Sequence, residues 1–405
     1  MEDAKRYAVC LIHMADPRGR RIGGTETYVR DYIRHHPADM DLLYIGPDEI
    51  GDLELGRVSA VECAGRRINY LALYRVESSL NVWADSIART DTFTLARALL
   101  KNWPKVRRVL RQGGYSVELR RVEIAPLVQS FGVPFVQMQH VMATKGEARS
   151  GVLARYPVIG TVAAGLAAAG CYRFYLVNED MTAACRRRFR PFARKFETLT
   201  TWADPEIFRP SAFPGGPLKL VFAGRADAFK RLDVMLDVVR RVAEQSRGAV
   251  EFHYVGDGDL ESFAQFAAVR QLTTRHGRTS AGELATLLRG MHVGLLTSAF
   301  EGMPRFVMET LASGRCVVAL QLPQLAAVIS AGVNGYLVDR DDDAERQNER
   351  FAARVLEIYG RMMRGETTPE AVAGPVRRFT PARLLGRIFD DHRALHGLPP
   401  NREAP

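Results

Sequence analysis

Two glutamates, Glu301 and Glu309, are separated by seven residues in the segment SAFEGMPRFVMETLASG (298–314). An apolar run before it, residues 291–298, predicts a buried strand, and Pro304 marks the start of a helix, where its missing N–H costs nothing. A helix N-terminus offers free N–H groups and a positive dipole end to an anion such as a diphosphate. Carboxylates accept hydrogen bonds from the hydroxyls of a sugar or a ribose. The backbone groups expected to bind the ligand are those of Gly302, Met303, Arg305 and Phe306.

Two cations, Arg225 and Lys230, stand in a second loop of the same kind. This loop follows the apolar strand pattern LKLVFAG and precedes the helical pattern RLDVMLDVV. Fixed cations above the carboxyl end of a strand stabilise a departing diphosphate more as its charge grows. The alternative is a pair of solvated loop residues.

The first half of the chain supplies fewer candidates. Gly23 and Gly24 form a loop in which the backbone can approach a ligand closely. Glu26 follows them as a first-turn carboxylate that favours the helix dipole, an interpretation preferred to a catalytic role. His140 comes directly after the apolar run VPFVQMQ, so we expect it at the carboxyl end of a strand, where ligands of open α/β sheets bind.

Strand patterns and helical patterns, which position these residues, alternate along the whole chain. Apolar strand patterns occur at residues 6–14, 41–46, 133–140 and 173–180 and again in the second half, with helical stretches between them. This alternation predicts an α/β fold with parallel sheets. Four prolines between residues 200 and 220 forbid a continuous element there and indicate a domain boundary.

The segments of the second half, taken together, resemble the nucleotide-sugar-dependent glycosyltransferases of family 4. The resemblance rests on the Glu, seven residues, Glu signature and on residues 218–239, 252–260, 280–298 and 331–339. It implies the GT-B fold, in which two Rossmann-like, doubly wound domains face each other across a cleft. It also implies transfer of a hexose from a nucleoside diphosphate sugar with retention of configuration and without a metal. A UDP-sugar is favoured as the donor, and GDP-mannose is the second option.

The resemblance extends to the domain organisation. It implies an acceptor-binding domain at 1–200, a linker at 201–217 and a donor-binding domain at 218–376. The segment 377–405 resembles a C-terminal helix that crosses back to the first domain, followed by a tail.

Roles for the candidate residues follow from the same resemblance. Arg225 and Lys230 would stabilise the leaving diphosphate, Glu301 would hold sugar hydroxyls, and Glu309 would hold the ribose. GGTETYV resembles the family's Gly-Gly-x-Glu loop, and His140 resembles a histidine set near the transferred sugar. One departure is Arg231, because the family usually has glycine after that lysine. Arg315, Cys316 and Gln321 are further departures, expected to alter loops near the donor.

A metal site is not expected. The sequence GDGD (256–259) imitates an Asp-x-Asp metal clip, but it follows a strand in a glycine-bearing turn, and Mg²⁺ also requires near-octahedral oxygen ligands. The run Asp341 to Asp343 is interpreted as a solvated loop. No cofactor is expected either, because neither half shows the Gly-x-Gly-x-x-Gly fingerprint of a dinucleotide-binding oxidoreductase.

Three other functions stay open. They are an inverting GT-B transferase, a nucleotide-sugar epimerase, and a transferase-like binding protein without catalysis. For the transferase, the expected acceptor is a glycan, a lipid-linked molecule or a small molecule.

Five scattered cysteines argue against a zinc site and a secreted disulfide framework, and the polar start MEDAKRY shows no signal peptide. A cytoplasmic protein is therefore expected. The apolar segment 152–170 contains Arg155 and Pro157 and is interpreted as a buried helix rather than a membrane span.

The net charge of +10 is concentrated in clusters at 18–21, 101–112 and 186–195. Solvated helix faces are the first interpretation, and attraction to an anionic membrane surface is the second. Nucleic acid is not an expected partner, because no helix-turn-helix, finger or aromatic-basic pattern accompanies the charge. The membrane interpretation predicts a peripheral protein on the cytoplasmic face, with Lys101, Lys105, Arg107, Arg108 and Arg111 among the contacting residues.

Overall fold

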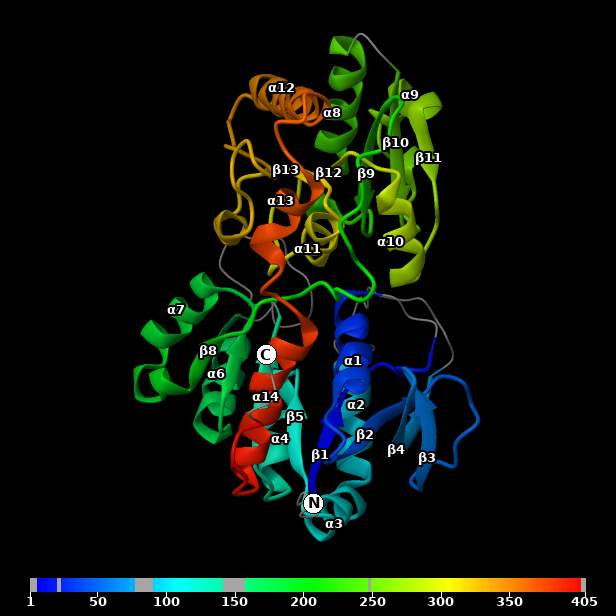
Figure 1. The fold of residues 1–405 in the computed structure, drawn as a ribbon. Coiled ribbons are helices and arrows are strands. Elements are labelled where there is room, and N and C mark those ends of the chain that lie inside the picture. Colours follow the sequence, from blue (N-terminus) through cyan, green and yellow to red (C-terminus); the bar gives the residue numbers. More distant parts are fainter. Residues whose placement is uncertain (1–5, 20–22, 77–89, 141–156, 247–248, 402–405) are drawn as a thin grey trace. The chain divides into compact units, whose positions relative to one another are not determined.

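The computed structural model of the chain describes residues 6–19, 23–76, 90–140, 157–246 and 249–401. These residues form two compact units (Figure 1). The first contains residues up to Thr200 together with the segment from Pro381 onward, and the second contains Thr201–Thr380. The fold class is α/β, with a mainly parallel sheet in each unit, as the alternation of patterns predicted.

An eight-stranded sheet forms the centre of the first unit, in the order β3-β4-β2-β1-β5-β6-β7-β8. Its central strands are buried nearly throughout. β1 therefore occurs in the sequence as a continuous apolar run, whereas β5 and β6 carry polar residues among their apolar ones. All pairs are parallel except β3 with β4, an antiparallel edge hairpin that the sequence analysis did not predict. The strands are β1 (Tyr7–Ile12), β2 (Met40–Asp48), β3 (Val58–Cys63), β4 (Arg66–Arg75), β5 (Ser116–Leu119), β6 (Phe135–Gln139), β7 (Phe174–Leu176) and β8 (Phe196–Thr198).

Helices cover both faces of this sheet, and the C-terminal helix α14 packs beside α1 (Figure 1). α14 buries Leu384, Leu385, Ile388 and Phe389, so it is part of the first unit's core. The helices of the unit are α1 (Gly24–His35), α2 (Asp91–Lys101), α3 (Trp103–Gln112), α4 (Ala125–Ser130), α6 (Pro157–Gly170), α7 (Glu179–Arg188) and α14 (Pro381–Leu395). A 3₁₀ segment, η3, spans Arg190–Lys195.

Helix α6 differs from the sequence expectation of a buried helix. It buries four alanines on one side, but Val158, Val162 and Leu166 on its other side are 74%, 56% and 46% exposed. The beginning of the apolar segment, residues 152–156, lies outside the described residues. Within the described part of the chain, no helix has both the length and the apolar character needed to cross a bilayer.

The second unit contains a six-stranded parallel sheet in the order β11-β10-β9-β12-β13-β14. The chain winds outward from β9 through β10 to β11, then returns to place β12 beside β9 on its other side. The topological switch point of this sheet therefore lies between β9 and β12, where open α/β sheets bind their ligands. The strands are β9 (Leu218–Ala223), β10 (Val250–Val255), β11 (Thr273–Arg275), β12 (Val293–Leu296), β13 (Cys316–Leu320) and β14 (Gly335–Val338).

The helices of the second unit follow its strands in order. Apolar residues at helical spacing bury one face of each longer helix; α8, for example, buries seven side chains, among them Leu236, Val239 and Val242. The helices are α8 (Leu232–Gln245), α9 (Phe266–Val269), α10 (Ala281–Arg289), α11 (Arg305–Ala312), α12 (Ala344–Met363) and α13 (Pro369–Ala373).

Candidate functional site

Two loops meet at the carboxyl edge of the second unit's sheet, one after β9 and one after β12. The Thr297 hydroxyl donates to the carbonyl oxygens of Lys230 and Arg231, at 2.9 Å each. The Ala299 N–H donates to the Phe229 carbonyl at 2.7 Å. These bonds fix the two loops to each other at the switch point of the sheet.

Lys230 and Glu301 are brought together by this arrangement. The Lys230 ammonium forms an ion pair with Glu301 Oε1, and the two side chains are only 15% and 12% exposed. The Ser298 hydroxyl donates to the same carboxylate oxygen at 2.8 Å, and the Gln324 amide donates to the Glu301 carbonyl at 2.6 Å. Lys230 and Glu301, which the sequence predicted as separate candidates, therefore form one ion pair.

Arg225 lies in the same loop as Lys230 but has a different partner. Its guanidinium pairs with Asp227 at 2.9 Å, and its side chain is 53% exposed. Arg225 is therefore more solvated than Lys230, and its charge is more strongly screened.

Arg231 occupies the position where the sequence resemblance leads one to expect glycine. Its backbone is left-handed, with φ 52° and ψ 52°, at the N-cap of α8. A glycine adopts this conformation without a steric penalty, whereas a residue with a Cβ does not. The Arg231 guanidinium binds both carboxylate oxygens of Asp233, which stabilises the turn in the absence of glycine.

The helix after the second loop is α11, with Pro304 at its N-cap. Glu309 is 6% exposed and accepts a 2.7 Å hydrogen bond from Arg305 Nε, one turn earlier in the helix. The Phe306 ring is buried against Phe222, so only the backbone N–H of Phe306 is a candidate for ligand contact. Gly302 is buried, and Met303 packs partly against the core.

The aspartates of the GDGD turn have structural roles. Gly256 has φ 152°, and a Cβ there would lie 2.3 Å from the Gly224 carbonyl oxygen. Asp257 pairs with Arg278, and Asp259 caps a short 3₁₀ helix by accepting from the Glu261 N–H.

The acidic run 341–343 is also used locally. Asp341 binds Arg346 and Arg350, and Asp343 is the N-cap of α12. Among the residues that the structure describes, no three His, Cys, Asp or Glu side chains are grouped as metal ligands would be.

The expectation for Arg315 and Cys316 was wrong. Cys316 is the first residue of β13, so both lie at the amino end of that strand, on the sheet edge opposite the loops of Lys230 and Glu301. Arg315 is fully buried and donates to the carbonyl oxygens of Leu288, Ser211 and Ala212. It therefore attaches the segment before β9 to the end of α10. Gln321 follows β13 at its carboxyl end.

In the first unit, His140 follows β6 and accepts a 3.0 Å hydrogen bond at Nε2 from Arg120 Nη1. A guanidinium only donates, so this contact assigns the lone pair to Nε2 and the proton of the neutral ring to Nδ1. Burial, and then the charges of Arg120 and Arg121, lower the pKa of His140 to about 3. The Tyr28 ring of α1 packs edge-on against His140 and face-on against Arg120.

Arg120 is the last member of a row of buried polar side chains that begins on β5. Ser116 and Glu118 alternate in the strand and so share one of its faces, and Arg120 follows directly after the strand. His392 of α14 contacts the Ser116 hydroxyl at 2.8 Å and Glu118 Oε2 at 3.5 Å, and Glu118 Oε1 lies 3.5 Å from Arg120 Nη2. The row connects α14 to His140 through the interior of the first unit.

Gly23 and Gly24 lie at the N-terminus of α1, with Gly23 at the N-cap. The Glu26 carboxylate folds back over Gly23, where an added Cβ would lie 2.4 Å from its Oε2 atom. Tyr28, one turn further along α1, is the residue through which this helix contacts His140.

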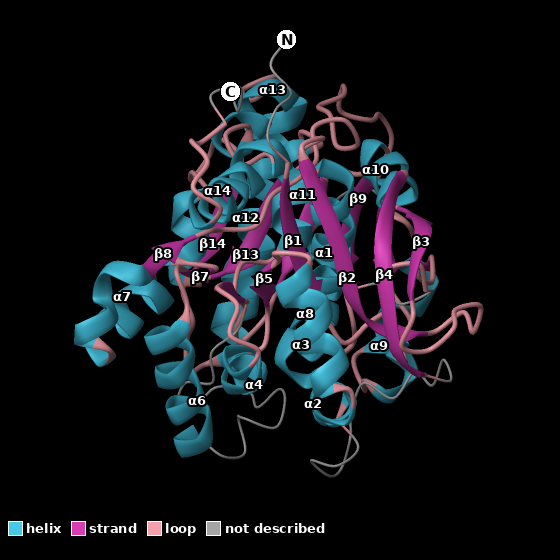
Figure 2. Cartoon of the chain, turned by 90° about the horizontal axis from the view of Figure 1, so that it is seen from below, coloured by secondary structure: helices cyan, strands magenta, loops and turns pink. Residues whose placement is uncertain are grey.

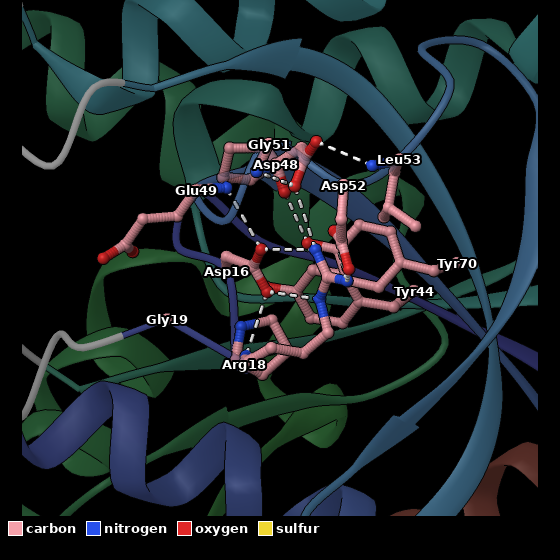
Figure 3. A network of polar contacts seen from close by, with 12 residues as sticks. Asp16, Arg18, Gly19, Tyr44, Asp48, Glu49, Gly51, Asp52, Leu53 and Tyr70 are labelled. Atoms are coloured by element: carbon pink, nitrogen blue, oxygen red, sulfur yellow. Dashed lines mark hydrogen bonds and ion pairs between the residues drawn. The ribbon is translucent and has the colours of Figure 1, made fainter.

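Arg18, which belongs to the basic group at 18–21, does not behave as a surface cation. Arg18 is 7% exposed and binds Asp16 at 2.8 Å, Asp48 at 3.0 Å and Asp52 at 2.9 Å (Figure 3). Arg18 therefore holds the loops after β1 and β2 together, and the membrane-contact expectation for it is wrong. Arg20 and Arg21 lie outside the described residues.

The same network lowers the pKa of Asp48. Burial alone raises it, but hydrogen bonds from the Leu53 and Gly51 N–H groups and from Arg18 outweigh the effect of burial. A cavity of about 590 Å³ adjoins the network, lined among others by Pro17, Arg30 and Glu62, and none of the predicted site residues lines it.

Sequence reasoning missed Arg120, Arg305 and Ser298 as partners of the predicted residues. For Arg120 a signal existed, because polar residues at alternate positions of a short strand, in SVELR, mark a face that needs buried partners. The bond between Arg305 and Glu309 follows helical i, i+4 spacing and was equally accessible.

Residues 217–360 match the family model described as glycosyl transferases group 1. A D-inositol 3-phosphate glycosyltransferase from Arthrobacter sp. (strain FB24) is 29% identical over 150 residues, which are 33% of this chain and 34% of that protein. The match therefore spans about a third of the length of that relative.

Two examples illustrate the solved structures that resemble nearly the whole chain. One is sucrose-phosphate synthase from Thermosynechococcus elongatus, with a TM-score of 0.74 and 16% identity over 97% of this chain and 100% of the other. The other is HepE from Anabaena, in complex with UDP and glucose, with a TM-score of 0.64 and 13% identity over 96% and 100% of the two chains. At this identity the likeness concerns the fold. The protein thus has the GT-B fold, and within its second unit residues 217–360 match the glycosyl transferases group 1 model.

Proposed function

We propose that the protein is a retaining glycosyltransferase that moves a hexose from a nucleoside diphosphate sugar to an acceptor hydroxyl. The acceptor belongs to a glycan, a lipid-linked molecule or a small molecule. The observation that carries the proposal is the ion pair of Lys230 with Glu301 at the switch point of the second sheet. The pair lies where open α/β sheets bind their ligands, and its ammonium and carboxylate support recognition of a phosphate and of sugar hydroxyls.

A UDP-sugar is the favoured donor. One structure with the same fold holds UDP and glucose, and the matched family model covers both loops of the candidate site. The N-terminus of α11, with the N–H groups around Gly302 and Met303, provides a diphosphate with donors and a positive dipole end. Glu309 is assigned to the ribose and Glu301 to hydroxyls of the sugar.

The reaction consists of one substitution at the anomeric carbon. The bond from this carbon to the β-phosphate oxygen breaks, and its electron pair leaves with the diphosphate. The acceptor oxygen forms the new bond on the same face, and its proton passes to the departing phosphate oxygen. Lys230 and Arg225 stabilise the charge that develops on that oxygen. No metal is required in this scheme.

The test combines binding with slow turnover in the absence of acceptor. UDP-glucose, UDP-galactose, UDP-N-acetylglucosamine and GDP-mannose are compared by thermal shift, because a ligand at a hundred times its dissociation constant adds about 2.7 kcal/mol of stability. Release of free nucleotide diphosphate is then followed by chromatography for the donor that binds.

We expect one donor to stabilise the protein and to be hydrolysed slowly. The Lys230→Ala variant, purified in the same way, serves as the control for contaminating hydrolases and should release no nucleotide above background. Binding without turnover by the wild type, with every acceptor class supplied, would instead identify a catalytically silent binding protein. Failure of all four donors to bind would contradict the proposal.

A further inference from the structure

The first unit exposes an apolar stripe on helix α6. Val158, Ile159, Val162 and Leu166 are 74%, 56%, 56% and 46% exposed, and they follow one another at helical spacing. Tyr172, two residues after the helix, is 41% exposed. Twelve large apolar side chains are exposed among the described residues, so this short stretch holds five of them. Such a concentration marks an interaction surface rather than ordinary scatter.

The opposite side of α6 is firmly attached to the unit. Ala163, Ala164, Ala167 and Ala168 are buried, and the helix packs against α4. The Gln129 amide donates to the Leu166 carbonyl at 2.7 Å, which ties the two helices together. The stripe is therefore a fixed feature of a packed helix, presented outward.

Cations border this stripe. The segment from Arg186 to Lys195 contains six basic and no acidic residues, and it spans the end of α7 and η3. Arg188 donates to the Thr161 hydroxyl of α6 at 2.9 Å, and Lys195 donates to the Ala169 and Cys171 carbonyls at 2.9 and 2.7 Å. Arg187, Arg190 and Arg194 are exposed. Both views of the unit show α6 and α7 together at one end of the sheet, near β7 and β8 (Figures 1 and 2).

We propose that α6 and the basic segment 186–195 form a docking surface for an anionic lipid bilayer. The apolar stripe enters the interface between headgroups and acyl chains, and the arginines bind the lipid phosphates. Apolar side chains on one face of a helix, flanked by cations, are the features that hold a helix in the plane of a membrane. Because the cations of segment 186–195 border the stripe, an anionic bilayer is the partner that this surface fits.

This surface differs from the basic helix α3 in a way that experiments can separate. On α3 the apolar Val106 and Leu110 are buried and the exposed positions include Lys105, Arg108 and Arg111. Those cations provide attraction that salt screens, but α3 offers no exposed apolar stripe for insertion. If α6 inserts, part of the protein's binding to anionic vesicles should therefore persist at high salt.

The first experiment measures flotation of the full-length protein with vesicles of phosphatidylcholine, with and without phosphatidylglycerol. Val162→Asp and Leu166→Asp should each lower binding to anionic vesicles at least about tenfold, because an inserted apolar group is lost and a like charge is added. Arg187→Glu with Arg190→Glu should act similarly at low salt. The matched control, Arg108→Glu with Arg111→Glu on α3, should have a smaller effect.

The second experiment locates the inserted residue directly. All five native cysteines are buried, so a single new cysteine can be labelled selectively with an environment-sensitive fluorophore in the folded protein. The fluorescence emission of a label at Val162→Cys should shift to the blue when anionic vesicles are added. The emission of a label at Ile50→Cys, a position that is 55% exposed in the loop after β2, should not shift.

The proposal is overturned if the α6 variants bind anionic vesicles as strongly as the wild type does. It is also overturned if the emission of the label at position 162 does not shift. Binding to neutral vesicles equal to that on anionic ones overturns it as well. If the chain forms dimers in solution and Val162→Asp makes them monomeric, the stripe is a contact between copies and not a membrane surface. Each readout is independent of transfer activity, so the outcome does not depend on the function proposed above.

Discussion

The ammonium of Lys230 and the carboxylate of Glu301 form an ion pair although the two residues are 71 positions apart in the chain. They belong to loops that follow neighbouring strands, β9 and β12. Each side chain neutralises the charge of the other. Under the proposed function, a diphosphate would compete with Glu301 for Lys230, and its binding would free the Glu301 carboxylate for sugar hydroxyls. We therefore expect phosphate and sugar recognition to be coupled through this pair.

Replacing Lys230 with Ala should reduce turnover by about 100-fold or more, because a cation that faces developing charge acts mainly in the transition state. The change for Arg225→Ala should be smaller, about tenfold, because the Arg225 side chain is 53% exposed and paired with Asp227. Steady-state kinetics with the identified donor measures both variants. If either variant raises only KM, its residue contributes binding and no leaving-group stabilisation.

Glu309→Gln keeps the shape of a side chain that is 6% exposed but removes its charge. Nucleoside diphosphate affinity should fall by roughly 1.5–3 kcal/mol, the value of hydrogen bonds to a charged group. Calorimetric titration with UDP measures this loss. The control is Glu349→Gln on α12, whose carboxylate is 56% exposed and pairs with Arg241. Equal affinity of the Glu309 variant and the control would show that Glu309 does not hold the ribose.

Arg231 provides a test of backbone strain. Because its φ is 52°, Arg231→Val should destabilise the second unit by about 1–3 kcal/mol. Arg231→Gly should be nearly neutral, since relief of strain offsets the lost ion pair with Asp233 and the greater freedom of the unfolded chain. Hydrogen exchange measured on peptides from α8 and β12 reports the stability of the second unit separately from that of the first. A valine variant as stable as the glycine variant would contradict the interpretation.

The contact of Arg120 with His140 predicts a pH dependence. The folded pKa of His140 is about 3 and lies below the unfolded value, so this histidine stabilises the fold above the unfolded pKa. That stability is lost as the pH falls from about 6.5 towards 3. Histidine NMR signals, with His140→Gln for assignment, should show no titration of His140 between pH 7 and 5.

Removing the charge of Arg120 should raise the pKa of His140. Burial remains, so the value should stay below that of an exposed histidine. Arg120→Met is combined with Glu118→Gln so that no unpaired charge is left in the interior. An unchanged His140 titration in this double variant would show that the guanidinium does not set the protonation state of the ring.

Much of the fold follows from local patterns, and particular residues explain what does not. Buried parallel strands such as β1 and β12 are continuous apolar runs, so the α/β class was predicted from them. The β3–β4 hairpin was missed because β3 is half exposed and its turn uses Ala64 and Gly65, with φ of 51° and 75°, in place of an Asn-Gly signal. The exposure of α6 was missed because an apolar composition does not indicate which side of a helix packs against the rest of the unit.

The candidate site shows the same division. Motif spacing predicted the loops that carry Lys230 and Glu301, whereas their mutual contact depends on the strand order of the sheet, which the sequence does not state. For Arg18, charge clustering predicted a surface cation, but Asp16 and Asp48 supply buried partners from two separate loops. The catalytic and binding roles of the site residues stay predictions for the experiments above.

The position of α14 has a consequence for the order of events during synthesis. The first unit lacks its last helix, and Ser116 and Glu118 lack their His392 contact, until the ribosome has made the whole second unit. The second unit is continuous in sequence, so it can finish folding while the first is still incomplete. A nascent chain stalled before residue 381 should therefore protect the second unit against proteolysis and leave the first unit vulnerable, the reverse of the usual vectorial order.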